Sequence, residues 1–242
     1  MKLFKKSSEL LWLLGTIFVA LGVAICSKAN LGVSMIAAPA FVISEAIPKS
    51  LSFFSVGVTE YIIQGLLLVI LCIAIKKFNW RYLLAFAVAI IYGYTLNFFL
   101  WVFDGVVLNA VWLRWIMLVL GDLCTAFGVA CFFRTYMPLQ VYELFVAEFT
   151  SRYKLNLNTV KWCFDIALLI VSLVLALTLF GDIGDFDWST IGYNSFHSIG
   201  LGTLFTTAFN SPFIRLGGVV VDKIFDPAPR FPKLKAFLKP EQ

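Results

Sequence analysis

The sequence predicts an all-helical protein that crosses a membrane six times. Of its 242 residues, 61% are hydrophobic and 14% are charged, whereas soluble domains have about 45–50% apolar and about 25% charged residues. Six segments each hold the roughly 20 mostly apolar residues that a membrane-spanning helix needs. These segments are residues 8–27, 55–75, 82–103, 111–133, 162–180 and 199–221.

Two further apolar segments, residues 33–47 and 138–150, are too short to cross a bilayer. The second is amphipathic and carries Glu143. Each is expected to form a short helix that either lies in the membrane interface or re-enters the membrane, where neighbouring helices or water must satisfy its backbone. The sequence leaves both alternatives open.

The distribution of Lys and Arg predicts the orientation, because cytoplasmic loops carry an excess of both. With the N-terminus inside, fifteen of these residues lie on the cytoplasmic side and three on the outer side. Both termini are therefore expected in the cytoplasm, and residues 222–242 form a basic cytoplasmic tail. An acidic loop then faces outward; it contains Asp182, Asp185 and Asp187.

An internal repeat divides the single membrane domain, residues 1–242, into two units, 8–103 and 111–221. A shift of 106 residues places Ala20–Ala24 on Ala126–Ala130 and Lys28 on Arg134. Each unit holds three spans and one short helix, and three is an odd number, so the second unit must be inserted upside down. Inverted repeats of this kind are typical of secondary transporters, whose substrate site lies between the units.

The residue types argue against several other function classes. The five cysteines have no CxxC spacing, there is one His, and no Ser/His/Asp or glycine-rich phosphate motif is present. The sequence therefore predicts no enzyme, no cofactor and no metal site. The net charge of +5 is explained by membrane orientation and a tail that can contact anionic lipid, so no nucleic-acid partner is expected.

Arg215 is the first substrate-binding candidate, because a charged residue within a span is costly and usually functional. It follows Pro212, where the helix is expected to kink or break, and a guanidinium binds carboxylate or phosphate groups in a bidentate manner. The alternative is that Arg215 reaches the nearby interface with its long side chain.

Three acids are candidates for coupling transport to H⁺ or Na⁺. Asp122 lies near the middle of its span, with a structural ion pair or a hydrogen bond to Thr125 as the alternative. Glu60 and Asp165 fall within one residue of each other in the repeat alignment. Lys161 precedes Asp165 by four residues, so these two are expected to pair on one helix face.

Further polar side chains are expected to line a slot between the third and sixth spans, where a shift of 118 places Asn97 on Arg215. The same side chains also serve as ordinary contacts between membrane helices. Glu143 joins this substrate-binding set if its short helix re-enters the membrane. The slot residues are Asn97, Asn210, Tyr92 and Tyr94.

Two short motifs resemble the YczE/YyaS/YitT-type family of bacterial membrane proteins. Lys28–Ser34, KANLGVS, is similar to the signature that ends the family's first span. Gly202–Leu204, followed by Ser211–Ile214, is similar to the pattern of its last span, whereas the family's Pro-x-Asp after the first signature is Met35–Ala37 here. The resemblance implies a multi-pass protein of the bacterial cytoplasmic membrane, with transport suspected.

The sequence favours a secondary, ion-coupled transporter of a small polar or anionic metabolite. The alternative is an accessory or substrate-capture membrane subunit that works with a partner protein. A channel is less favoured, because the candidate lining mixes both signs of charge. The sequence leaves open the substrate, the coupling ion and whether the chain forms a homo-oligomer.

Overall fold

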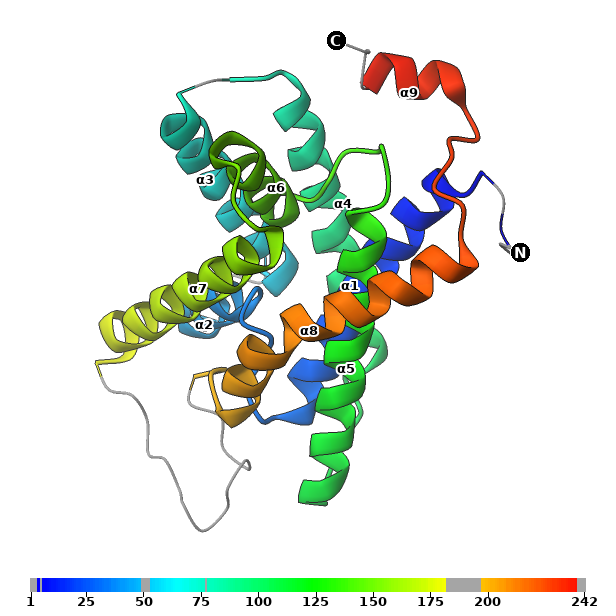
Figure 1. Cartoon of the computed structure of the whole chain (residues 1–242). Helices are drawn as coiled ribbons and strands as arrows, with labels where there is room; N and C mark the ends of the chain where they lie inside the picture. The colour runs from blue at the N-terminus through cyan, green and yellow to red at the C-terminus, as the bar shows by residue number, and fades with distance from the viewer. Residues whose placement is uncertain (1–3, 5, 49–52, 77, 182–196, 239–242) are drawn as a thin grey trace.

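The computed structural model describes residues 4, 6–48, 53–76, 78–181 and 197–238. The regular elements of these residues are nine α-helices (Figure 1). The predicted outer loop with Asp182, Asp185 and Asp187 lies outside the described residues. The helices are α1 (Ser8–Ala29), α2 (Ala38–Ala46), α3 (Val56–Ile75), α4 (Arg81–Val102), α5 (Val111–Phe132), α6 (Val141–Tyr153), α7 (Leu157–Phe180), α8 (Leu201–Ile224) and α9 (Pro232–Leu238).

Six of these helices confirm the predicted spans: α1, α3, α4, α5, α7 and α8 are long and apolar enough to cross a membrane. Their outer faces carry large apolar side chains, among them Ile73 and Trp101, which are 70% and 73% exposed. Lipid is the natural solvent for such a surface. The predicted class, an all-helical polytopic membrane protein, is therefore confirmed.

Helix α7 begins five residues earlier than the sequence predicted. The side chain of Asn156 caps it by accepting a hydrogen bond from the backbone N–H of Asn158 at 2.9 Å. Lys161, which precedes the predicted span 162–180, lies inside α7, where it is 3% exposed and pairs with Asp165. The helix tolerates this buried cation because the carboxylate one turn later neutralises it, so the predicted pair is confirmed.

Helix α8 also differs from its prediction, because it continues through Pro212 without a break. Membrane helices tolerate an internal proline when local adjustments and neighbouring groups satisfy the freed backbone carbonyl. The buried face of α8 is polar along its first half; it carries Thr203, Thr206, Thr207, Asn210 and Ser211.

Helices α1 and α5 cross closely at the centre of the molecule. A methyl group on Gly22 would lie 2.5 Å from the backbone oxygen of Gly121, and one on Gly128 would lie 2.8 Å from that of Gly15. The earlier glycine of each helix thus faces the later glycine of the other, so the two helices run antiparallel. Small residues at the crossing let the two backbones approach.

The two short helices have equivalent surroundings, because α2 and α6 each pack against both α3 and α7. The first turn of each is buried: Ala38–Ala40 in α2 and Val141–Glu143 in α6. Their later residues reach the surface, as exposed Glu45 and Ser151 show. Because α2 follows the end of α1 and α6 the end of antiparallel α5, the two enter the bundle from opposite ends. Whether either helix re-enters a membrane stays a prediction.

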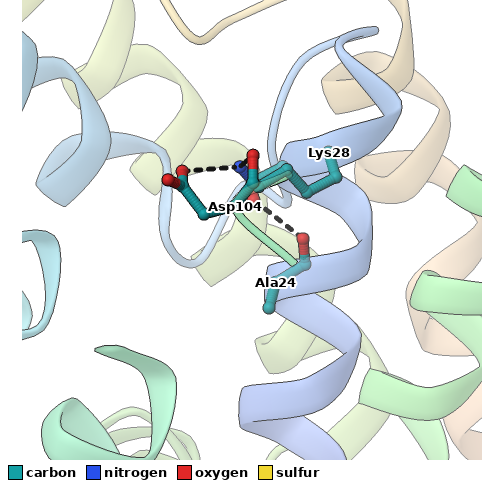
Figure 2. A network of polar contacts seen from close by, with 4 residues as sticks. Ala24, Lys28 and Asp104 are labelled. Atoms are coloured by element: carbon teal, nitrogen blue, oxygen red, sulfur yellow. Dashed lines mark hydrogen bonds and ion pairs between the residues drawn. The ribbon is translucent and has the colours of Figure 1, made fainter. Parts of the chain in front are cut away.

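Two ion pairs join helix ends at these opposite ends of the bundle. Lys28 Nζ lies 3.4 Å from Asp104 Oδ1, which connects the last turn of α1 to the segment after α4 (Figure 2). Arg134, just after α5, donates to both carboxylate oxygens of Asp222 near the end of α8, each at 2.7 Å. Each pair therefore links the first and third spans of one predicted unit.

The start of α1 lies beside the segment that follows α8, at one end of the molecule (Figure 1). The Glu9 carboxylate in α1 accepts hydrogen bonds from the backbone N–H groups of Arg230 and Phe231 at 3.0 Å. The Tyr136 hydroxyl donates to the same carboxylate at 2.5 Å. This anchors the segment before α9, a helix that the sequence did not predict. Which side of a membrane this end faces remains a prediction.

Candidate functional site: a buried carboxyl cluster

Four carboxyl groups from four different helices lie in the interior, each within electrostatic reach of at least one of the others. They belong to Glu60 of α3, Asp122 of α5, Glu143 of α6 and Asp165 of α7. Each of the four residues is at most 1% exposed. Together with Lys161 they are called here the buried carboxyl cluster.

Glu60 lies in the second turn of α3, which begins at Val56 behind its cap Ser55. The Tyr142 hydroxyl of α6 donates to Glu60 Oε2 at 2.8 Å, whereas Oε1 is buried without a hydrogen-bond partner. The Gln64 side chain, one turn further along α3, lies beside the same carboxyl group. Glu60 therefore connects α3 to the first turn of α6.

Glu143 is the third residue of α6, so its carboxyl group lies near the helix N-terminus. Its Oε2 atom is buried and has no hydrogen-bond partner. Burial raises the pKa of Glu143 to about 7, although the nearby Lys161 opposes this shift. A carboxyl group with such a pKa takes up and releases a proton near neutral pH.

Asp122 is buried without a hydrogen bond to either carboxyl oxygen. The Thr125 hydroxyl, its expected structural partner, instead donates to the backbone oxygen of Gly121 at 3.0 Å. Asp165 and Lys161 are within electrostatic reach of Asp122. Within the described residues the carboxyl group therefore has charged neighbours but no direct partner.

Asp165 differs from the other acids because it has a cation of its own. Its Oδ1 atom accepts from Lys161 Nζ, and the Asn210 side chain of α8 lies beside the same carboxyl group. Its second oxygen, Oδ2, is buried and has no hydrogen-bond partner in the part of the chain that the structure describes. The pairing therefore satisfies only part of the carboxylate.

The charges of the cluster do not balance. Four carboxylates and one ammonium would carry a net charge of −3 if all were ionised. An ionised carboxylate away from water is strongly disfavoured unless a cation or several donors compensate it. The cluster must therefore hold protons, or a cation from outside the chain.

Other buried polar atoms near these acids also lack hydrogen-bond partners in the described residues. The Tyr92 hydroxyl of α4 is one; it lies within reach of both Glu60 and Glu143. Both side-chain polar atoms of Gln140, the residue before α6, are others. Unsatisfied buried polar groups are rare in folded proteins and mark places where water, an ion or a ligand belongs.

The structure brings together only some of the residues that the sequence singled out. Glu60, Asp122, Glu143, Asp165, Tyr92 and Asn210 lie in or beside the cluster.

The other predicted substrate-binding residues lie elsewhere. Arg215 is on an exposed face of α8, and Tyr94 is 67% exposed. Asn97 has a structural role: its Oδ1 accepts from the Gly57 N–H at 2.9 Å and its amide donates to Ser55 Oγ at 2.8 Å, which stabilises the start of α3. The predicted slot between the third and sixth spans is therefore not assembled from these residues.

The sequence did not single out Gln64, Gln140 or Lys161 as site residues. Gln64 could have been found, because an amide in the middle of an apolar span is as unusual as a carboxyl group. Lys161 was missed because the continuous apolar segment starts only after it. Gln140 gave no signal, since a polar residue before a short helix is common.

One protein-family model matches residues 6–217. The chain belongs to this family, DUF6198. Its description is a family of unknown function, and all four acids of the cluster lie within the matched residues. No curated protein and no solved structure matches the chain significantly.

A cleft of ≈ 380 Å³ opens at the α9 end of this DUF6198 protein. It lies between the start of α4, the end of α5 and α6, and Leu238 of α9 lines it. Leu144 and Glu148 of α6 also line the cleft, whereas Glu143, next to Leu144, belongs to the cluster. Helix α6 therefore separates the cleft from the buried carboxyl cluster.

Proposed function

We propose that this protein is a secondary transporter that couples the movement of a small polar metabolite to the movement of protons. The observation that supports the proposal most strongly is the buried carboxyl cluster, whose charge its own residues do not balance. Such intramembrane acids are costly and typically mark ion or proton pathways. Glu60, Glu143 and Asp122 are the proposed proton-carrying groups, and Asp165 with Lys161 holds the cluster together.

The second support is the predicted inverted repeat. The 106-residue shift converts Gly15 into Gly121 and Gly22 into Gly128, so it exchanges the two contacts of the α1–α5 crossing. The packing of α2 on α3 and α7 has its counterpart in the packing of α6 on α7 and α3. Two inverted halves around a central site are the arrangement in which transporters expose one site alternately to each side.

The two ion pairs that join helix ends are also related to each other by the predicted repeat. Lys28 aligns with Arg134 at a shift of 106, and Asp104 aligns with Asp222 at a shift of 118. Each pair stiffens the link between the first and third spans of its own half. Halves that are internally rigid can rock against each other as units, which is how inverted-repeat transporters alternate.

The resemblance to YczE/YyaS/YitT-type proteins is part of this proposal, and the contacts of its two motifs are compatible with it. The Gly202 N–H donates to the Leu31 carbonyl at 2.7 Å, and the Thr203 hydroxyl donates to the Val33 carbonyl at 2.7 Å. The two motifs therefore form one junction between the turn after α1 and the start of α8.

The proposal is tested with purified protein in liposomes that enclose a pH-sensitive dye. A panel of cationic, neutral and anionic metabolites is added outside, and proton movement across the membrane is recorded. At least one metabolite is expected to evoke proton movement. Glu60→Gln and Glu143→Gln should reduce its rate at least tenfold, whereas Glu45→Gln, on the exposed part of α2, should not.

The absence of proton movement with every metabolite would contradict the transporter proposal. Co-purification of a partner protein would then favour the accessory-subunit alternative. Unchanged rates in both Glu60→Gln and Glu143→Gln would show that transport does not use the buried carboxyl cluster.

A further inference from the structure

The charges and the unpaired oxygens of the buried carboxyl cluster indicate which charge a ligand would carry there. Lys161 is committed to Asp165 through a direct ion pair. Glu60, Glu143 and Asp122 form no ion pair within the described residues, and each has at least one buried oxygen without a hydrogen-bond partner. A ligand that enters this environment with a negative charge would add to an existing excess of negative charge. A positive charge would reduce that excess.

Two tyrosines lie beside one of these acids, Glu60. Tyr142 donates to Glu60, and its ring packs against that of Phe164 with ring centres 6.3 Å apart. Tyr92, completely buried, lies on the other helix that approaches Glu60 and Glu143. Carboxylates combined with aromatic faces are the groups by which proteins recognise organic ammonium ions, through charge pairing and cation–π attraction.

The described residues do not favour a metal ion in this place. They contain no group of three or more His, Cys, Asp or Glu side chains placed to hold one. The acids are spread over four helices rather than converging on a point. An organic cation is larger than a metal ion and is satisfied by such dispersed oxygens and rings.

We propose that the buried carboxyl cluster binds a small organic cation bearing an ammonium group, in exchange for a proton. This inference rests on the proposed transport function and names its substrate class. One proton leaves the cluster for each positive charge that binds, so the net charge of the site is conserved. The exchange of a singly charged cation for one proton across the membrane is then electrically neutral. The exposed Arg215 takes no part in binding.

The groups expected to face the ligand come from five of the helices packed around the site. Glu60 is on α3, Tyr92 on α4, Asp122 on α5 and Glu143 on α6, and α7 supplies Lys161 with Asp165. Lys161 acts on Asp122 and Glu143 but is not among the groups that act on Glu60. The ligand is therefore expected beside Glu60, on the α3–α4–α6 side, where Glu143 and Tyr92 also lie. Glu60 and Glu143 are therefore the carboxyl groups expected to pair with it.

The test uses the full chain in detergent and three probes of different size: ethylammonium, choline and putrescine chlorides. Acetate and glycerol are the anionic and neutral probes, and KCl keeps the ionic strength equal. At least one cation should raise the thermal midpoint beyond KCl by binding the native state. Its binding should release protons. The affinity of the wild-type protein for ethylammonium or choline should fall about tenfold per pH unit in acid, because one proton competes, and that for the doubly charged putrescine about a hundredfold, because two protons compete.

Glu60→Gln and Glu143→Gln should each weaken this binding at least tenfold, and Glu45→Gln should leave it unchanged. The pH competition is measured on the wild-type protein, so it decides the matter even if a variant folds poorly. Binding of none of the cations beyond KCl, or affinity independent of pH, would overturn the inference. Retention of binding in both variants would also overturn it.

The liposome assay separates this inference from the proposed function. Proton movement evoked only by neutral or anionic metabolites would overturn the organic-cation inference and leave the transporter proposal standing. The absence of both cation binding and proton movement would overturn both. Cation-evoked proton movement that does not respond to an imposed membrane potential supports the one-for-one exchange.

Discussion

At the scale of single residues, Lys161 is the side chain on which the stability of the buried carboxyl cluster most depends. It is the one cation of the buried carboxyl cluster within the described residues, and Asp165 accepts its hydrogen bond directly. Asp122 and Glu143 both lie within its electrostatic reach. Removal of one member of a buried ion pair leaves an uncompensated charge, which costs more than the pair itself contributes.

Lys161→Met is therefore expected to destabilise the protein by about 3–5 kcal/mol. The double variant Lys161→Met/Asp165→Leu removes both charges and should recover most of this loss. The free energy of unfolding, measured in detergent with increasing denaturant at neutral pH, gives the comparison. A single variant as stable as the wild type would show that Asp165 is not held as an ion in this protein.

Glu143 should make stability depend on pH. The pKa of this acid is raised by burial from 4.5 to about 7, so the folded protein holds the proton more tightly than the unfolded chain. Folding stability should consequently decrease as the pH rises from about 4.5 to about 7, and this contribution should be constant at higher pH. Glu60 and Asp165 oppose ionisation of Glu143, and Lys161 favours it.

Glu143→Gln cannot ionise and should lose this part of the pH dependence. At pH 8 it should be more stable than the wild type by about 3 kcal/mol, whereas at pH 4.5 the two should be alike. Glu45→Gln, which is on the exposed part of α2, should follow the wild-type profile. Parallel wild-type and Glu143→Gln profiles across this range would contradict the burial of an ionisable Glu143.

The acids of the site could be selected from the sequence because each interrupts an apolar segment. Their proximity in the interior could not be predicted, because it depends on how α3, α5, α6 and α7 pack. Arg215 satisfied the same sequence criterion, yet the helical turn places it on the exposed face of α8. Whether a side chain points into the bundle or out of it depends on where the neighbouring helices lie. A membrane span is apolar on all sides, so its sequence gives little information about these positions.

At the scale of elements, the spans were predictable because hydrocarbon imposes their length and composition. The helix boundaries were less predictable than the spans themselves. Helix α7 starts at Leu157 because Asn156 caps it and Asp165 neutralises Lys161. The tail helix α9 was not foreseen, since contacts with distant residues such as Trp80 position it. The small residues of α1 and α5 were noticed as a repeat, whereas their mutual contact was not.

Substitution at the α1–α5 crossing should show how tightly it is packed. Gly128→Ala places a methyl group 2.7 Å from Val19 Cγ2, and Gly22→Ala places one 2.5 Å from the Gly121 oxygen. Each should destabilise the protein by about 1–3 kcal/mol, because the helices must separate. Gly105→Ala, with no atom within 4 Å of the added group, is the matched control and should keep the wild-type thermal midpoint. Unchanged midpoints in all three would mean that the helices do not cross here.

At the scale of the whole molecule, α2 and α6 enter from opposite ends. The start of α1 and helix α9 both lie at the end from which α6 enters (Figure 1). The excess of Lys and Arg predicts that this end faces the cytoplasm. The cleft beside α6 would then open inward, and the exposed part of α2 would face outward. The structure and the charge pattern are independent sources, so their combination makes a sharp prediction about which residues each side of the membrane can reach.

Single cysteines in a chain whose five native cysteines are replaced by alanine test this arrangement. Ser151→Cys lies beside the cleft on α6, and Glu45→Cys lies on the exposed part of α2. A membrane-impermeant maleimide should label Glu45→Cys in intact cells and Ser151→Cys only in inside-out vesicles. Reversal of both results would keep the arrangement and invert the orientation. Labelling of both positions from the same side would contradict the entry of α2 and α6 from opposite ends, and with it the two-fold relation on which alternating exposure of the buried carboxyl cluster depends.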